Sequence, residues 1–159
     1  MKDYVAEAKA LGFSDAAFMD VADLVIVPEY RQFCEENRCG NYGVLSVCPP
    51  ESGTVEEMTA KVRRYKTALV LTMVITPVSY TDTAEQKAAK RRQNELTEQL
   101  MAAMRADGLT DLLMMGAGPW KNASCMSAYC VNAQKMADHV HMKCWENDGK
   151  IRYFSLILF

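Results

Sequence analysis

The sequence predicts an α/β fold, a single-domain sandwich in which one mixed sheet of about four or five strands carries packed helices. Residues 67–76 are apolar and β-branched without polar alternation, which indicates a strand buried on both faces. Residues 83–107 carry apolar side chains at helical spacing. The chain has 159 residues, half of them apolar, so we expect one domain over residues 1–159 with its own core.

The N-terminal part alternates helical and extended patterns. Residues 2–11 predict a helix that ends at Gly12, because glycine readily leaves the helical conformation. Residues 16–20 and 24–27 predict short extended segments. Pro28 suits the first turn of a helix, so we expect a turn or helix that leads to the first cysteine.

A helix before the central strand has the clearest local signal. Thr54 and Glu57, three residues apart, form the pattern of a capping box, in which each side chain accepts from the other's backbone. The predicted helix runs to about residue 66 and leads directly into the strand at 67–76.

The second half supplies the longest helix and two further core strands. Residues 83–107 form the helix, Gly108 ends it, and its inner face carries Leu96, Leu100, Ala103 and Met104. Residues 109–115 and 151–159 are apolar stretches of strand length.

Six cysteines form two groups of three in distant parts of the chain, Cys34, Cys39 and Cys48 in the first and Cys125, Cys130 and Cys144 in the second. The spacings are C-x4-C-x8-C-P-P and C-x4-C-x13-C. Thiolates are soft ligands for iron, zinc or copper(I), so all six are candidate metal ligands. Neither group contains C-x-x-C, the spacing of zinc ribbons, ferredoxins and thioredoxins, so the metal stays open.

A buried structural thiol is the alternative for each cysteine. For Cys130, which falls on a predicted helix, both interpretations stay open. Cys39 and Cys48 flank the turn Gly-Asn-Tyr-Gly rather than an apolar stretch, which favours ligation. His139 and His141 precede Cys144 and could bind zinc, but on a helix they point to different sides, and solvated histidines are favoured.

Charge and the N-terminal sequence limit the partners. The net charge is −2 with acids and bases interspersed, so we expect no nucleic-acid or membrane partner. The first nine residues are charged and lack the apolar core of a signal peptide, so we expect a cytoplasmic protein. Cytosolic thiols stay reduced, which favours metal ligation over disulfides.

Two loops are expected to bring the cysteines together. Pro49 and Pro50 fix the chain's exit from Cys48, and the glycines of the preceding turn permit left-handed backbone. The loop 116–119, Gly-Ala-Gly-Pro, lacks the features of a phosphate loop, so we expect it to position Cys125. The first loop precedes the predicted helix at 54–66, and the second follows the strand that ends near residue 115. We therefore expect the two cysteine groups to converge at one edge of the sheet.

These motifs resemble a known family. Residues 10–17, Ala-Leu-Gly-Phe-Ser-Asp-Ala-Ala, the first cysteine group with Asn-Tyr-Gly and Cys-Pro-Pro, and Gly-Ala-Gly-Pro at 116–119 are similar to the predicted metal-binding proteins of the DUF2284 family. The resemblance extends from about residue 11 to residue 158 and implies a cysteine-ligated metal. Relatives carry a cysteine just after Gly-Pro and a dense C-x2-C-x2-C run, whereas Trp120 stands after Pro119 here. The second ligand set therefore departs from the family pattern.

The candidate cysteine ligands predict two alternative functions. In the first, four of the six thiolates hold an iron-sulfur cluster, with [4Fe–4S] favoured over other types, and the protein passes electrons to an unknown redox partner. In the second, zinc organises the loops into an interaction module without catalytic activity. A thiol-disulfide oxidoreductase is disfavoured by the absence of C-x-x-C. The sequence assigns neither a substrate nor an oligomeric state.

Overall fold

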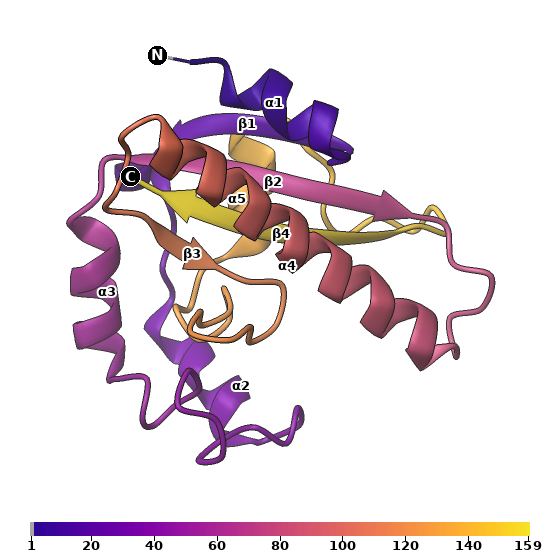
Figure 1. Ribbon diagram of the computed structural model, residues 1–159. Helices are drawn as coiled ribbons and strands as arrows, with labels where there is room; N and C mark the ends of the chain where they lie inside the picture. The colour runs from indigo at the N-terminus through magenta and orange to yellow at the C-terminus, as the bar shows by residue number, and fades with distance from the viewer. Residues whose placement is uncertain (1) are drawn as a thin grey trace.

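A four-stranded antiparallel sheet forms the centre of the protein (Figure 1). The structure is a computed structural model that describes residues 2–159. The strand order is β1-β2-β4-β3, with β1 at Asp15–Asp20, β2 at Thr67–Ile75, β4 at Ile151–Leu158 and β3 at Leu113–Met115. The predicted α/β class and strand number are confirmed. Parallel pairing is limited, within residues 2–159, to an isolated bridge between Gly116 and Cys125.

Strand β2 is the central strand that the sequence predicts. It pairs with β1 on one side and with β4 on the other. Leu69 and Leu71 pack on one face of the sheet, and Ala68 and Val70 pack on the opposite face. Because both faces are covered, β2 has no polar alternation in its first half.

Helices α1 (Tyr4–Leu11) and α4 (Thr83–Ala106) belong to the core on one face. The inner side of α4 places Leu96, Leu100 and Met104 in this core, as the helical spacing predicts. Gly12 ends α1 with φ 126°, a left-handed conformation that a residue with a Cβ adopts only with strain.

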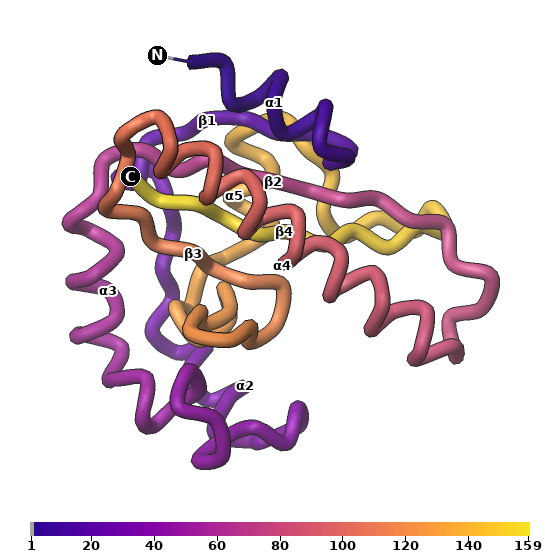
Figure 2. Tube along the Cα trace, in the orientation of Figure 1, coloured from indigo at the N-terminus to yellow at the C-terminus, as the bar shows by residue number. Residues whose placement is uncertain are grey.

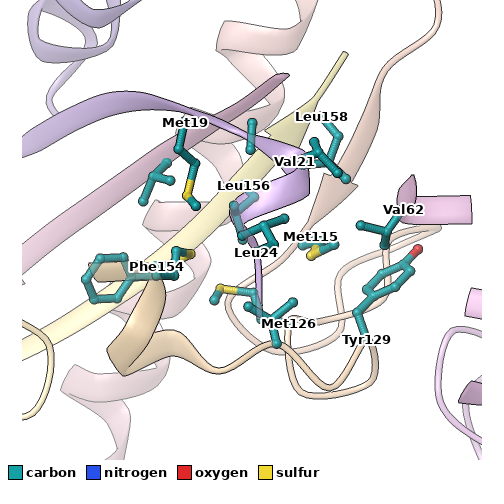
Figure 3. Packing of buried hydrophobic residues seen from close by; sticks show 14 of the residues in the cluster. Met19, Val21, Leu24, Val62, Met115, Met126, Tyr129, Phe154, Leu156 and Leu158 are labelled. Atoms are coloured by element: carbon teal, nitrogen blue, oxygen red, sulfur yellow. The ribbon is translucent and has the colours of Figure 1, made fainter. Parts of the chain in front are cut away.

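Helices α3 (Val55–Arg63) and α5 (Ala133–His139) contribute to the core on the other face. Figure 3 shows this core, in which side chains from three strands meet those of the loop after β3; its members include Met19, Leu24, Met115, Met126 and Leu156. The Thr54–Glu57 capping box of α3 is confirmed. The helix ends three residues before residue 66, because the backbone at 66–67 already pairs with Phe159.

The start of β3 and the conformation at Cys130 also differ from the prediction. The strand predicted at 109–115 begins only at Leu113, because the Leu109 amide still donates to the Met104 carbonyl and completes the end of α4. Cys130 lies in a turn before α5, not on a helix. The backbone at residues 130–132 instead forms hydrogen bonds with residues 25–27. The Val27 amide donates to the Cys130 carbonyl at 2.9 Å.

The first cysteine group follows a short helical segment. The 3-10 turn η1 (Val21–Asp23) follows β1, and η2 (Pro28–Tyr30) leads into α2 (Arg31–Glu35), as Pro28 predicts. In Figure 2 the purple loop after α2 lies at the end of the molecule opposite α1. No helix within residues 2–159 combines the length and apolar character needed to cross a membrane.

Candidate metal centre

The loop that carries the first cysteine group is held in shape by its own backbone and one side chain. The Asn37 Oδ1 accepts from the Tyr42 amide at 2.9 Å, and the Gly43 amide donates to the Pro49 carbonyl at 2.9 Å. The Cys48 amide donates to the Leu45 carbonyl at 3.0 Å. These bonds close residues 37–49 into a ring that brings Cys48 back toward Cys39.

Left-handed backbone makes this ring possible. Gly40 has φ 79° and Gly43 has φ 71°, as expected for the turn between the second and third cysteines. Asn37 adopts φ 58°, a conformation that asparagine tolerates better than most residues. The two glycines of the Gly-Asn-Tyr-Gly turn therefore allow the backbone to curve at these positions.

The loop after β3 places Cys125 beside the end of the sheet. The Gly116 amide donates to the Ser124 carbonyl at 3.0 Å, and Gly116 forms the isolated parallel bridge with Cys125. A Cβ on Gly116 would lie 2.6 Å from the Gly118 carbonyl oxygen, so only glycine fits. The loop positions Cys125, as the sequence predicts.

Asn94 anchors this loop to α4, a role that the sequence reasoning missed. The buried Asn94 side chain accepts from the Ala117 amide at 2.9 Å and donates to the Ala117 carbonyl at 2.9 Å. The available signal was the helical spacing that places Asn94 on the same side of α4 as the buried Met101, seven residues later. A buried amide that makes two such bonds fixes the loop against the helix.

Both cysteine groups open onto one cavity. Its volume is about 960 Å³, and the five cysteines that line it are Cys34, Cys39, Cys48, Cys125 and Cys144. Cys39 is exposed, Cys34 and Cys125 are half-buried, and Cys48 is buried. All six cysteines are free thiols. The two loops therefore bring cysteines from distant parts of the sequence to the same place.

Four of these thiols are linked electrostatically through Cys39 and Cys125. Burial is the main cause of the raised pKa of Cys34, which reaches about 11, and of the raised pKa of Cys48 and Cys125. Charge on Cys125 raises the pKa of Cys34 and Cys48 further, and charge on Cys39 raises the pKa of all three. We call Cys34, Cys39, Cys48 and Cys125, which share the cavity and these electrostatic effects, the four-thiol group.

Cys130 lies near Cys34, whose pKa its charge also raises, but it does not line the cavity. It is fully buried with φ 60°, and its Sγ lies 4.0 Å from the carbonyl oxygens of Pro28 and Ala128. Burial raises the pKa of this thiol, and the nearby Arg31 guanidinium opposes the shift. Cys130 is therefore an interior thiol beside backbone carbonyls.

Cys144 lines the cavity apart from the four-thiol group. Burial raises the pKa of Cys144 to about 11, and its charged neighbours are Asp138 and Arg152 rather than other cysteines. Neither histidine lines the cavity. His139, the last residue of α5, places its Nε2 3.5 Å from the Asp23 Oδ2, and His141 is exposed.

Arg31 joins the two cysteine-bearing loops. Its Nη1 donates to the Gly53 carbonyl at 2.8 Å, and its Nη2 donates to the Ala128 carbonyl at 3.2 Å. Its positive charge opposes the raised pKa of Cys34. One guanidinium therefore ties α2 to the chain on both sides of the cavity.

We expect Arg31→Met to weaken metal retention and to lower the free energy of unfolding by about 1–3 kcal/mol, because two charge-assisted hydrogen bonds are lost. Arg63→Met is the matched control, since Arg63 also donates to two carbonyls, those of Val21 and Leu24, at 2.6 and 2.9 Å. Urea unfolding and metal analysis of both variants separate the roles. Equal metal loss in the two variants would contradict a specific role for Arg31.

The donor set consists of sulfur alone, which suits soft metals. Within residues 2–159, no three Cys, His, Asp or Glu side chains already surround a single point as ligands of one metal ion. The four-thiol group instead lies around the wide cavity formed by two loops. The residues present therefore fit a soft metal by the chemistry of their donor atoms.

Comparison with known protein families matches residues 17–123 to the family described as predicted metal-binding protein (DUF2284). The match covers more than half of the chain and includes Cys34, Cys39 and Cys48. It is shorter than the resemblance predicted from residue 11 to residue 158 and ends just before Cys125. No curated protein and no solved structure matches the chain.

Proposed function

The chain belongs to the DUF2284 family of predicted metal-binding proteins, and from this premise we propose that it carries an iron-sulfur cluster on the four-thiol group. The observation that supports the proposal is the meeting of Cys34, Cys39 and Cys48 with Cys125 at one cavity. Four thiolates are the usual ligand number of a [4Fe–4S] cluster. Cys130 and Cys144 are outside this ligand set.

A bound cluster would supply single-electron transfer. The protein's own residues supply the setting: buried Cys48 and half-buried Cys34 and Cys125 limit contact with water. Arg31 places a positive charge beside Cys34, which favours its thiolate form. Burial raises the pKa of Cys125, and hydrogen bonds from the backbone of Ala128 and Ser127 oppose that shift. Such contacts to ligand sulfurs tune cluster potentials.

The redox partner would approach the exposed side of the first loop. Cys39 is exposed, and the same region exposes three large apolar side chains, Phe33 at 52%, Val44 at 68% and Leu45 at 39%. Weak electron-transfer complexes use small surface patches close to the redox centre. This surface supports electron transfer with a protein partner.

Zinc is the alternative metal, because four thiolates also form a closed structural zinc site. In that case the metal would tie the two loops together and present their surface without chemistry of its own. The Cys48-Pro49 sequence favours the cluster, because the same Cys-Pro pair closes the ligand run of bacterial ferredoxins.

Anaerobic purification distinguishes the two metals. We expect a brown protein with broad visible absorption and with iron and acid-labile sulfide in about equal amounts, roughly four of each per chain. A colourless protein with about one zinc per chain would establish the zinc module instead. Protein that binds neither metal after reconstitution with iron and sulfide, or with zinc, would contradict both functions.

A further inference from the structure

The cavity extends well beyond the four-thiol group. Its far part is bounded by α4, by the chain just before β4 and by the first residues of β4. A volume of about 960 Å³ is at the upper end for cavities that hold small organic molecules. The cysteines occupy one region of it, so the remaining space is open to a second occupant.

The cavity is lined by more basic than acidic side chains. Lys87, Lys90, Lys150 and Arg152 line its far part, Arg38 lies beside Cys39, and Glu146 is the one acidic residue among its described lining residues. This concentration contrasts with the protein as a whole, whose net charge is −2. Basic groups around a concave surface focus a positive potential within it.

Three of the five basic groups are available to a ligand. The two arginines are already paired, Arg38 with Glu36 at 3.0 Å and Arg152 with Asp148 at 2.6 Å. Lys87, Lys90 and Lys150 form no ion pair within residues 2–159. Lys87 and Lys90 are three residues apart on α4, so they lie on one face of the helix.

The walls between these lysines and the cysteines are mostly apolar. They include aromatic and aliphatic side chains from three parts of the chain, among them Pro49, Pro119, Met126, Ile151 and Phe154. Trp145, which is 78% exposed, stands at the edge. An apolar wall with charges at one rim suits a molecule that has an apolar body and a charged end.

We propose that this cavity binds a small organic anion, with the anionic group at Lys87, Lys90 and Lys150 and the apolar body against the wall toward the cysteines. Carboxylate, sulfonate and phosphate groups share the required charge. The proposal goes beyond the metal centre and does not rest on it, because the lysines and the wall belong to the protein itself.

Two fluorescent probes of nearly the same shape test the proposal. 8-Anilinonaphthalene-1-sulfonate carries a negative charge, and N-phenyl-1-naphthylamine is its uncharged counterpart. We expect the metal-free full chain to bind the sulfonate more tightly than the uncharged probe. In the double variant Lys87→Gln/Lys90→Gln, the affinity for the sulfonate should fall about threefold to tenfold. High salt should reduce the affinity of the sulfonate but not that of the neutral probe.

Arg91→Gln is the matched control, because Arg91 is an exposed base next to Lys90 that does not line the cavity. It should leave the affinity of both probes unchanged. Benzoate should displace the sulfonate at lower concentration than acetate or inorganic phosphate, because only benzoate also contacts the apolar wall. Inorganic phosphate as the best competitor would instead assign a phosphate-bearing ligand.

Equal affinity for the two probes would overturn the proposal, as would an equal effect of Arg91→Gln and the double lysine variant. Metal content of the same variants is measured separately. If the double lysine variant retains its metal but no longer binds the sulfonate, the anion site is separate from the metal centre. If the protein binds no metal at all, the probe measurements still test the anion site. Circular dichroism of each variant confirms that the fold is unchanged.

Discussion

Replacing Cys48 with serine is expected to lower bound metal by more than about tenfold, since even residues that only support metal ligands cost about that much when removed. Cys48 is buried at the cavity and lies close enough to Cys39 and Cys125 for their charges to raise its pKa. Serine offers a hard oxygen in place of a soft thiolate. Iron, sulfide and zinc analysis after anaerobic purification provides the measurement.

The same loss is expected for Cys34→Ser, Cys39→Ser and Cys125→Ser. Cys39→Ser is the most informative of these, because Cys39 is exposed and its replacement disturbs no packing. A loss of metal in that variant with an unchanged fold therefore reports ligation alone.

Cys130→Ser and Cys144→Ser are the matched controls and should retain most of the metal. Cys130 faces carbonyl oxygens of Pro28 and Ala128, which a serine hydroxyl could use as acceptors. Cys144 has Asp138 and Arg152 as its charged neighbours. Full occupancy in the Cys39 and Cys48 variants would reject the four-thiol group and leave ordinary loop thiols as the better account.

Signals confined to a few neighbouring residues predicted most of the fold. The unbroken apolar stretch of β2 indicated a strand covered on both faces, and Thr54 with Glu57 marked the start of α3. The errors arose where distant contacts decide the outcome. The local sequence around Cys130 predicts a helix. The structure differs because the backbone there pairs with residues 25–27, about 100 residues earlier in the chain.

The sequence predicted that cysteines form the candidate site, but not which of them share the cavity. Cysteine chemistry identified six candidates, and the spacing could not tell which of them meet. That selection depends on how the loop after α2 lies against the loop after β3. Arg31 and Asn94, which hold these loops, were missed because an arginine or asparagine in a helical pattern is usually solvent-exposed.

The metal-free chain is expected to keep its sheet, because the two cores consist of ordinary apolar side chains on both faces of β2 and β4. Leu156 tests this expectation. It is fully buried on β4 between β2 and β3, opposite Val70 and Met115. Leu156→Ala should lower the free energy of unfolding by about 3 kcal/mol, through lost apolar burial and a cavity.

Urea unfolding of chelated wild-type protein and chelated Leu156→Ala, followed by far-UV circular dichroism, measures this difference. We expect chelated wild type to show native secondary structure and a cooperative transition, and Leu156→Ala to shift that transition to lower urea. Cys39→Ser, whose side chain is exposed, should unfold like chelated wild type. Loss of the transition on chelation alone would instead make the metal the folding core, as in zinc fingers, because the apolar cores would then be insufficient without it.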